Sequence, residues 1–332
     1  MKRFIYVFSL VLFLIIAGCT DSDQETQQQD QDNTDTEEME EADSNTDHAE
    51  DEAEEVEGER PEGFLWKVEQ GPTTVYLLGT IHIAPRDFFP LSETVEQAYE
   101  ESDVVVPEID MNNIDMFEME QITNQYASYQ DGTTLEDHIS PELYEQVEDI
   151  FEGTIVPMES VKQYKPWFVT NQIEQMKILE LGYTDGVDQY FLNKAESDEK
   201  EVVALETVED QLSIFADLSE DYQIEMLEET IESQDNYEEE LNGMLEVYRQ
   251  GDEEALLDML IVEEEESDPE DEAYLTALND ERNYHMAEQI QEFLEAEEDQ
   301  TYFVIVGSLH LTLEPHIGSI LEEEGYEVTR VN

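Results

Sequence analysis

The sequence predicts an α/β fold: a mixed, partly parallel sheet with a long helical insertion, in a single globular domain over residues 60–332. Apolar, β-prone runs cluster near both ends of this region, as at residues 74–78 and 302–306. Segments with helical periodicity alternate with these runs, which is typical of a layered α/β protein. No Gly-, Ser- or Pro-rich linker divides the region, so we expect one domain.

The first predicted elements are a β-hairpin and a helix. Two apolar runs, at 64–68 and 74–80, flank a Gln-Gly-Pro turn signal at 70–72 and predict paired strands. Residues 92–101 have the pattern of an amphipathic helix, which Ser92 is placed to cap.

The next predicted strand, 103–107, ends at Glu108 and leads into a largely helical middle. Residues 113–182 are mostly helical in pattern, and Pro141 stands at the favoured first position of one helix. A further helix is predicted from 185 to about 196.

The second half of the region repeats the alternation of strand and helix. The sequence predicts a short strand at 201–206, long acidic helices within 219–297 and a strand at 302–306. A helix from about 315 to 324 and a closing strand at 326–331 complete the chain.

Residues 1–19 predict a lipoprotein signal peptide. Two basic residues precede an apolar stretch at 4–16, and the Ile-Ala-Gly-Cys sequence that ends at Cys19 resembles a bacterial lipobox. An ordinary signal peptide with a chance cysteine is the alternative, and a spanning helix would need roughly 20 apolar residues. We expect lipid on Cys19 to hold the chain at the extracytoplasmic face of the cell membrane. Because Cys19 is the only cysteine, disulfides and cysteine-ligated metals are excluded.

The segment between the signal and the domain is strongly acidic. Residues 20–59 contain nineteen Asp or Glu and no Lys or Arg, so the sequence predicts a disordered tether. Acidity continues in residues 60–332, where 70 Asp or Glu face 11 Lys or Arg. Self-repulsion at this density is tolerable where salt screens it, which favours a halophilic or alkaliphilic source. Nucleic-acid binding is disfavoured because little basic charge is present to neutralise phosphates.

Polar residues follow four of the predicted strands. His82 and His310 each end a Gly-x-x-His sequence, and Glu108 and Glu206 lie at the ends of two other strands. Parallel neighbouring strands would bring these side chains to one rim of the sheet.

Two imidazoles and one or two carboxylates suit a hydrolytic divalent metal ion, with a coordination position left for water. A second carboxylate could act as general base or orient a ligand histidine. A single histidine at the end of a strand is more often a hydrogen-bonding or packing residue than a metal ligand.

Seven sequence runs together resemble a known family over residues 63–331. They lie at 64–68, 76–82, 105–108, 186–192, 205–211, 281–287 and 306–311. In these runs the chain resembles the TraB/GumN family, which is related to the Tiki-type membrane-anchored metalloproteases. The sequence after His310 departs from the glycine-richer turn expected there, which puts the shape of that loop in question.

The resemblance implies a metal-dependent hydrolase site. It implies that His82, Glu108 and His310 hold a divalent ion (Mn, Co or Zn), with Glu206 and Arg282 as catalytic residues. Glu206 is a candidate base, whereas Arg282 either binds substrate or is a structural partner of carboxylates.

The expected function is therefore that of a surface lipoprotein with metal-dependent peptidase activity on a peptide or small-molecule substrate. The alternative is a non-catalytic protein that sequesters a peptide signal or small ligand. Esterase or haem-binding chemistry rests on fold analogy alone and ranks last.

Overall fold

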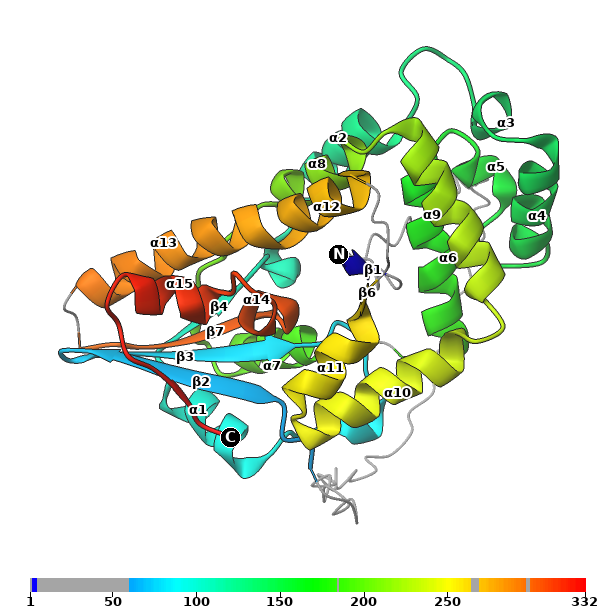
Figure 1. Cartoon of the computed structure of the whole chain (residues 1–332). Helices are drawn as coiled ribbons and strands as arrows, with labels where there is room; N and C mark the ends of the chain where they lie inside the picture. Colours follow the sequence, from blue (N-terminus) through cyan, green and yellow to red (C-terminus); the bar gives the residue numbers. More distant parts are fainter. Residues whose placement is uncertain (1, 5–59, 184, 264–268, 297–298) are drawn as a thin grey trace, which may run out of the picture. The chain divides into compact units, whose positions relative to one another are not determined.

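A six-stranded mixed sheet forms the centre of the computed structural model, which describes residues 2–4, 60–183, 185–263, 269–296 and 299–332 (Figure 1). The sheet has the strand order β5-β4-β7-β3-β2-β8. Neighbours among β5, β4, β7 and β3 run parallel, whereas β2 is antiparallel to β3 and β8. The strands are β2 (Phe64–Gln70), β3 (Thr73–Thr80), β4 (Val104–Pro107), β5 (Glu201–Val202), β7 (Thr301–Gly307) and β8 (Val328–Arg330). The predicted mixed, partly parallel sheet and the single α/β domain are confirmed.

Two predictions concern residues that the structure mostly leaves undescribed. The signal peptide at 1–19, with Cys19, and the tether at 20–59 lie outside the described residues, apart from a short strand β1 (Lys2–Phe4). That strand pairs antiparallel with β6 (Ile261–Glu263). None of the helices in the described part of the chain is long and apolar enough to cross a membrane.

The hairpin forms where the turn signal predicts it. Strands β2 and β3 pair from Phe64 with Gly79 through to Gln70 with Thr73. Gly71 has φ 59°, a left-handed conformation that glycine adopts without steric cost.

Helices cover both faces of the sheet because successive strand residues point to opposite sides. Val104 and Val106 pack with α13 (Glu281–Glu295) and α15 (Ile317–Glu323). Val105, between them, packs with α1 (Glu93–Glu101) and α7 (Val187–Ser197). Figure 1 shows these two helix pairs on opposite sides of the strands. The continuous apolar runs of the sequence therefore correspond to strands buried on both faces.

The helical insertion consists of two stretches of chain. The first, between β4 and β5, holds η2 (Met111–Asn113), α2 (Met116–Ala127), α3 (Leu135–His138), α4 (Pro141–Phe151), α5 (Met158–Val161), α6 (Pro166–Glu180) and α7. The second, between β5 and β7, holds α8 (Val208–Ala216), α9 (Glu220–Ser233), α10 (Tyr237–Gln250), α11 (Glu253–Leu260), α12 (Pro269–Leu275), the π-helical turn η3 (Thr276–Asp280) and α13.

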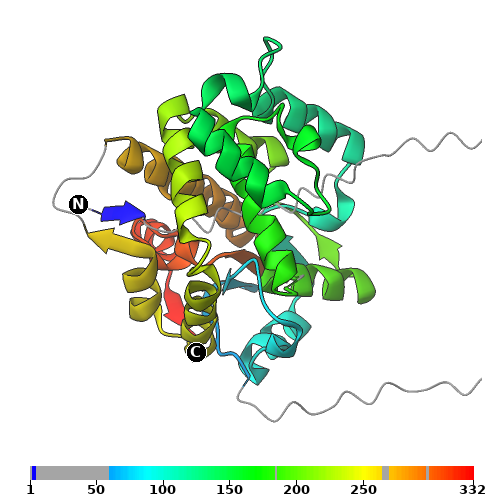
Figure 2. The ribbon, with the colours of Figure 1, turned by 90° about the vertical axis from the view of Figure 1, so that its right-hand side faces the viewer.

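These two stretches pack on each other beyond the sheet. Helix α6 contacts α9, and α2 contacts α8. Figures 1 and 2 show α6 and α9 beyond the carboxyl ends of β3 and β7. The insertion therefore covers that edge of the sheet, where polar residues follow the strands.

Some predicted boundaries are wrong. Strand β5 covers only 201–202 of the predicted 201–206, although the N–H groups of Leu205 and Glu206 still donate to the carbonyls of Pro107 and Glu108. The helix expected from 315 begins at Ile317 and is capped by His316, and the closing strand is shorter than predicted. The predictions of these boundaries fail because the ends of strands and helices depend on local hydrogen bonds rather than on apolar periodicity.

Candidate metal site

The carboxyl edge of the parallel strands gathers the predicted site residues. Glu108 directly follows β4, and His82 follows β3 by two residues. His310 lies in the short helix α14 (Leu309–Thr312), which begins just after β7. The parallel register places Thr80 beside Gly307 and Pro107 beside Ile305, so β3 and β7 end together and β4 ends two residues earlier.

Gly307 marks the point on which three of these side chains converge. A Cβ atom at this glycine would lie 3.4 Å from Glu108 Oε1 and 3.6 Å from both His310 Cδ2 and His82 Nε2. His310 Cδ2 and His82 Nε2 are therefore separated by no more than twice 3.6 Å. Only a residue without a side chain leaves this space open. The structure thus brings His82, Glu108 and His310 together.

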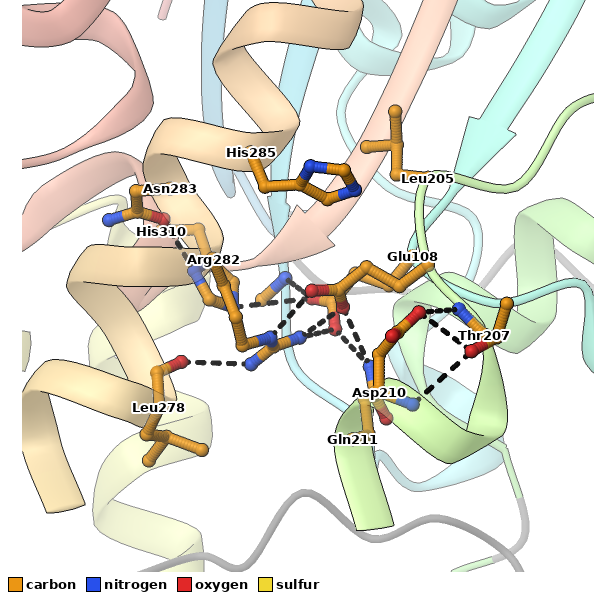
Figure 3. Close-up of polar contacts among 12 residues, drawn as sticks. Glu108, Leu205, Thr207, Asp210, Gln211, Leu278, Arg282, Asn283, His285 and His310 are labelled. Carbon is orange, nitrogen blue, oxygen red and sulfur yellow. Dashed lines mark hydrogen bonds and ion pairs between the residues drawn. The ribbon is translucent and has the colours of Figure 1, made fainter. Parts of the chain in front are cut away.

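Arg282 joins the two predicted carboxylates in a buried network (Figure 3). Its Nη2 donates to Glu108 Oε2 and to Glu206 Oε2, each at 2.6 Å, and its Nε donates to Glu206 Oε1 at 2.8 Å. Its Nη1 donates to the Leu278 carbonyl at 2.9 Å. Gln211 Nε2 also donates to both carboxylates, at 2.9 and 3.1 Å. Every nitrogen of the guanidinium therefore has an acceptor.

The network keeps Glu108 ionised. Burial disfavours the charge, but Arg282, His310, His82 and the N–H of Gly307 outweigh it and lower the pKa of Glu108 to about 2. Burial likewise opposes the charge of Arg282, whose pKa is nonetheless raised by the two carboxylates. A buried charge pair of this kind persists because each ion satisfies the other.

His310 is buried and held at one ring nitrogen. Its Nδ1 lies 2.6 Å from Asn283 Oδ1, and its Nε2 lies 3.7 Å from Glu108 Oε1. Burial, with the positive charge of Arg282, lowers the pKa of His310 to about 3. The ring is therefore neutral at physiological pH.

His82 is only partly buried and has an acidic partner. Its Nδ1 lies 3.3 Å from Asp188 Oδ1, at the start of α7. Burial favours the neutral ring, but Asp188 and Glu108 outweigh it and raise the pKa of His82 to about 9. A cation bound at Nε2 would have to displace this proton.

The donor atoms suit a divalent ion. No three His, Cys, Asp or Glu side chains among the described residues already stand in a metal-binding arrangement. Both rings nevertheless use Nδ1 for a protein partner, which leaves His82 Nε2 facing the space at Gly307 and His310 Nε2 facing Glu108 Oε1. The 3.7 Å between His310 Nε2 and Glu108 Oε1 is less than two bonds of about 2.0–2.2 Å to a shared ion. The set of two imidazoles and a carboxylate is one that Zn, Co and Mn accept.

Sequence reasoning assigned no role to three residues that complete the site: Asp188, Gln211 and Asn283. All three lie inside runs that carry the family resemblance, which was the available signal. Their contacts could not be inferred because α7, α8 and α13 reach the site only through tertiary packing.

Comparison with known proteins agrees with this resemblance. The sequence model of the TraB/PrgY/gumN family matches residues 64–330, a range that contains every site residue described above. No curated protein and no solved structure matches the chain.

Proposed function

The chain belongs to the TraB/PrgY/gumN family, and from this premise we propose that it is a metal-dependent hydrolase that cleaves peptides. One observation carries the proposal: His82, His310 and Glu108 converge on the open space at Gly307. Arg282 pairs with Glu108 through Oε2, which leaves Oε1 on the side of the imidazoles, 3.7 Å from His310 Nε2, with a lone pair for a cation.

In this proposal His82 and His310 bind the ion through Nε2, and Glu108 binds it through Oε1. A divalent ion held there, which we propose to be Mn, Co or Zn, would supply Lewis-acid chemistry for hydrolysis of a carbonyl group. The N–H of Gly307 donates to Glu108 Oε1 at 2.6 Å and fixes the position of that oxygen.

The contacts of Glu206 and Arg282 favour positioning roles. The sequence left Glu206 as a candidate base and Arg282 between substrate binding and a structural role. Both oxygens of Glu206 already accept hydrogen bonds from Arg282, and every Arg282 nitrogen is engaged. We therefore propose that Glu206 orients the Arg282 side chain, and that Arg282 stabilises the charged form of Glu108.

The proposal also places the domain outside the cell. A lipid on Cys19 would anchor it to the membrane, with residues 20–59 as a spacer, because the first nineteen residues have the pattern of a lipoprotein signal. Cys19→Ala should release the protein from the membrane fraction, and unchanged membrane association together with the absence of lipid on Cys19 in wild type would overturn this part.

Metal analysis of the purified protein tests the site. We expect one divalent ion per chain, and its loss in His82→Ala and in His310→Ala. His285→Ala is the matched control, because His285 lies on α13 and contacts Gln289 instead of the site. A wild-type protein without stoichiometric metal, together with no change in His82→Ala, would remove the hydrolase proposal.

The alternative is a protein that binds a peptide or small ligand without cleaving it. The burial of Glu206 and its ion pair with Arg282 favour this alternative, since a general base must reach the proton that it removes. Incubation with a peptide mixture and mass spectrometry separates the two, because hydrolysis yields fragments and sequestration returns the intact peptide from the complex.

A further inference from the structure

We propose that Asn283 is a positioning residue that fixes the tautomer of His310 and thereby directs the Nε2 lone pair toward Glu108. The consequence for metal binding rests on the proposed function. The hydrogen-bond argument itself does not, so the two can fail separately.

The orientation of the Asn283 amide is determined by its second partner. Asn283 is fully buried, and its Nδ2 donates to the Pro315 carbonyl at 2.7 Å. A carbonyl oxygen only accepts, so the NH₂ group must face Pro315 and Oδ1 must face His310. Reversing the amide would set two acceptors against each other in a buried place, which costs about 1–3 kcal/mol.

This orientation determines which ring nitrogen of His310 carries the proton. Asn283 Oδ1 can only accept, and it lies 2.6 Å from His310 Nδ1, so Nδ1 must be the donor. A neutral imidazole has a single N–H, and Nε2 is therefore left with a lone pair. That lone pair lies 3.7 Å from Glu108 Oε1, which is also an acceptor. Two acceptors that face each other at this distance favour a cation between them.

The fold delivers this constraint together with the charge network. Asn283 and Arg282 are consecutive on α13, which begins directly after the π-helical turn η3. Arg282 contacts Glu108 and Asn283 contacts His310. The first turn of α13 therefore positions two of the three proposed ligands. Such wide turns are frequent where a helix presents side chains to a functional site.

The two histidines have partners of different charge. His82 faces the carboxylate of Asp188, whereas His310 faces a neutral amide. An amide orients a neutral ring without stabilising an imidazolium, so it suits a ring that must keep Nε2 free for a cation.

Nitrogen-15 NMR of the metal-free full chain tests the tautomer. In wild type we expect His310 to carry its proton on Nδ1, and in Asn283→Ala we expect a shift toward the Nε2–H form. Asn283→Asp should retain the wild-type tautomer, because a carboxylate also accepts from Nδ1–H, although it should be less stable because it loses the donor to the Pro315 carbonyl. Thr170→Ala is the matched control, since it removes a different buried side-chain hydrogen bond, to the Pro166 carbonyl in α6.

Titration with Co²⁺, followed by its visible absorption, measures the consequence. Asn283→Ala should bind about 10–100-fold more weakly than wild type, with Asn283→Asp closer to wild type and Thr170→Ala unchanged. A proton on Nε2 in the wild-type protein would overturn the proposal, even if Asn283→Ala fails to fold. So would a folded Asn283→Ala with unaltered tautomer and Co²⁺ affinity. If the wild type binds no Co²⁺ but shows the expected tautomers, the hydrolase proposal fails and the positioning role stands.

Discussion

Arg282 is the residue on which the charge balance of the site depends. Glu108 and Glu206 are both buried, and a carboxylate only accepts hydrogen bonds. Without the guanidinium the two groups would repel each other in an interior without water to solvate them. The bidentate geometry toward Glu206 also fixes the direction of the arginine side chain. One guanidinium therefore serves two carboxylates, in a chain that is itself strongly acidic.

Arg282→Met should destabilise the fold by about 3–5 kcal/mol, because it leaves two buried carboxylates without their partner. Urea unfolding measures this loss. Lys162→Met is the control: its pair with Glu159 is exposed, and we expect no measurable change. A loss in Arg282→Met no greater than in the control would contradict the buried ion-pair network.

Gly307→Ala should leave the fold intact and impair the site. The added Cβ would make only ordinary contacts, at 3.4 Å or more, but it would occupy the space that His82, His310 and Glu108 share. We expect weaker metal binding with near-wild-type stability, measured by metal analysis and thermal unfolding. Gly186→Ala is the contrasting variant, because its Cβ would meet the backbone of His82 at 2.3 Å and should unfold or displace that segment. Full metal content in Gly307→Ala would contradict this location of the site.

The residue scale also gives a pH dependence. Burial, together with Glu101, raises the pKa of Tyr76 to about 12, above the value near 10 of an unfolded chain. Stability from the protonated phenol is therefore fully present below pH 10 and is lost as pH rises toward 12. Tyr76→Phe should unfold less steeply with pH over this range than wild type in circular-dichroism melts. The same dependence of stability on pH in the two proteins would contradict the raised pKa of Tyr76.

At the scale of elements, the loop between β5 and α8 links the sheet to the helical insertion. Thr207 Oγ1 accepts from Asp210 N at 3.2 Å, and Asp210 Oδ2 accepts from Thr207 N at 2.9 Å (Figure 3). Thr207, the N-cap of α8 (Val208–Ala216), directly follows Glu206 and lies four residues before Gln211. The strand predicted up to 206 ends at 202, but backbone hydrogen bonds to β4 and Glu108 continue to Glu206, directly before the cap.

Thr207→Ala should cost about 0.5–2 kcal/mol through the lost cap and should also weaken metal binding, because Glu206 and Gln211 flank it. The matched control is Ser140→Ala, which removes the cap of α4 through its bond from Leu143 N. We expect a similar loss of stability there with unchanged metal content. Equal metal content in both variants would contradict the prediction that the cap of α8 supports metal binding.

At the scale of the whole molecule, charge is the dominant feature. The chain has a formal net charge of −76, and residues 60–332 hold 70 acids against 11 Lys or Arg. Such an excess destabilises a compact state through self-repulsion, and salt reduces this repulsion. The screening length falls from about 10 Å at 0.1 M to about 3 Å at 1 M salt.

Raising NaCl from 0.05 to 1 M should therefore raise the thermal midpoint of the protein. Sucrose at equal osmolarity is the control, because it stabilises compact states without screening charge. A midpoint that is unchanged by NaCl, or no higher than in sucrose, would argue against charge repulsion as the limit on stability.

The sequence by itself determined the layered α/β class, the hairpin and the positions of His82, Glu108 and His310 at strand ends. These follow from local signals: apolar runs mark buried strands, and a Gly71 turn or a Gly-x-x-His ending is readable from neighbouring residues. Only the tertiary structure decided that both oxygens of Glu206 are engaged and that Asn283 sets the proton of His310. Those contacts join residues from separate helices and strands, and a hydrogen bond depends on distances and directions that no spacing along the chain encodes.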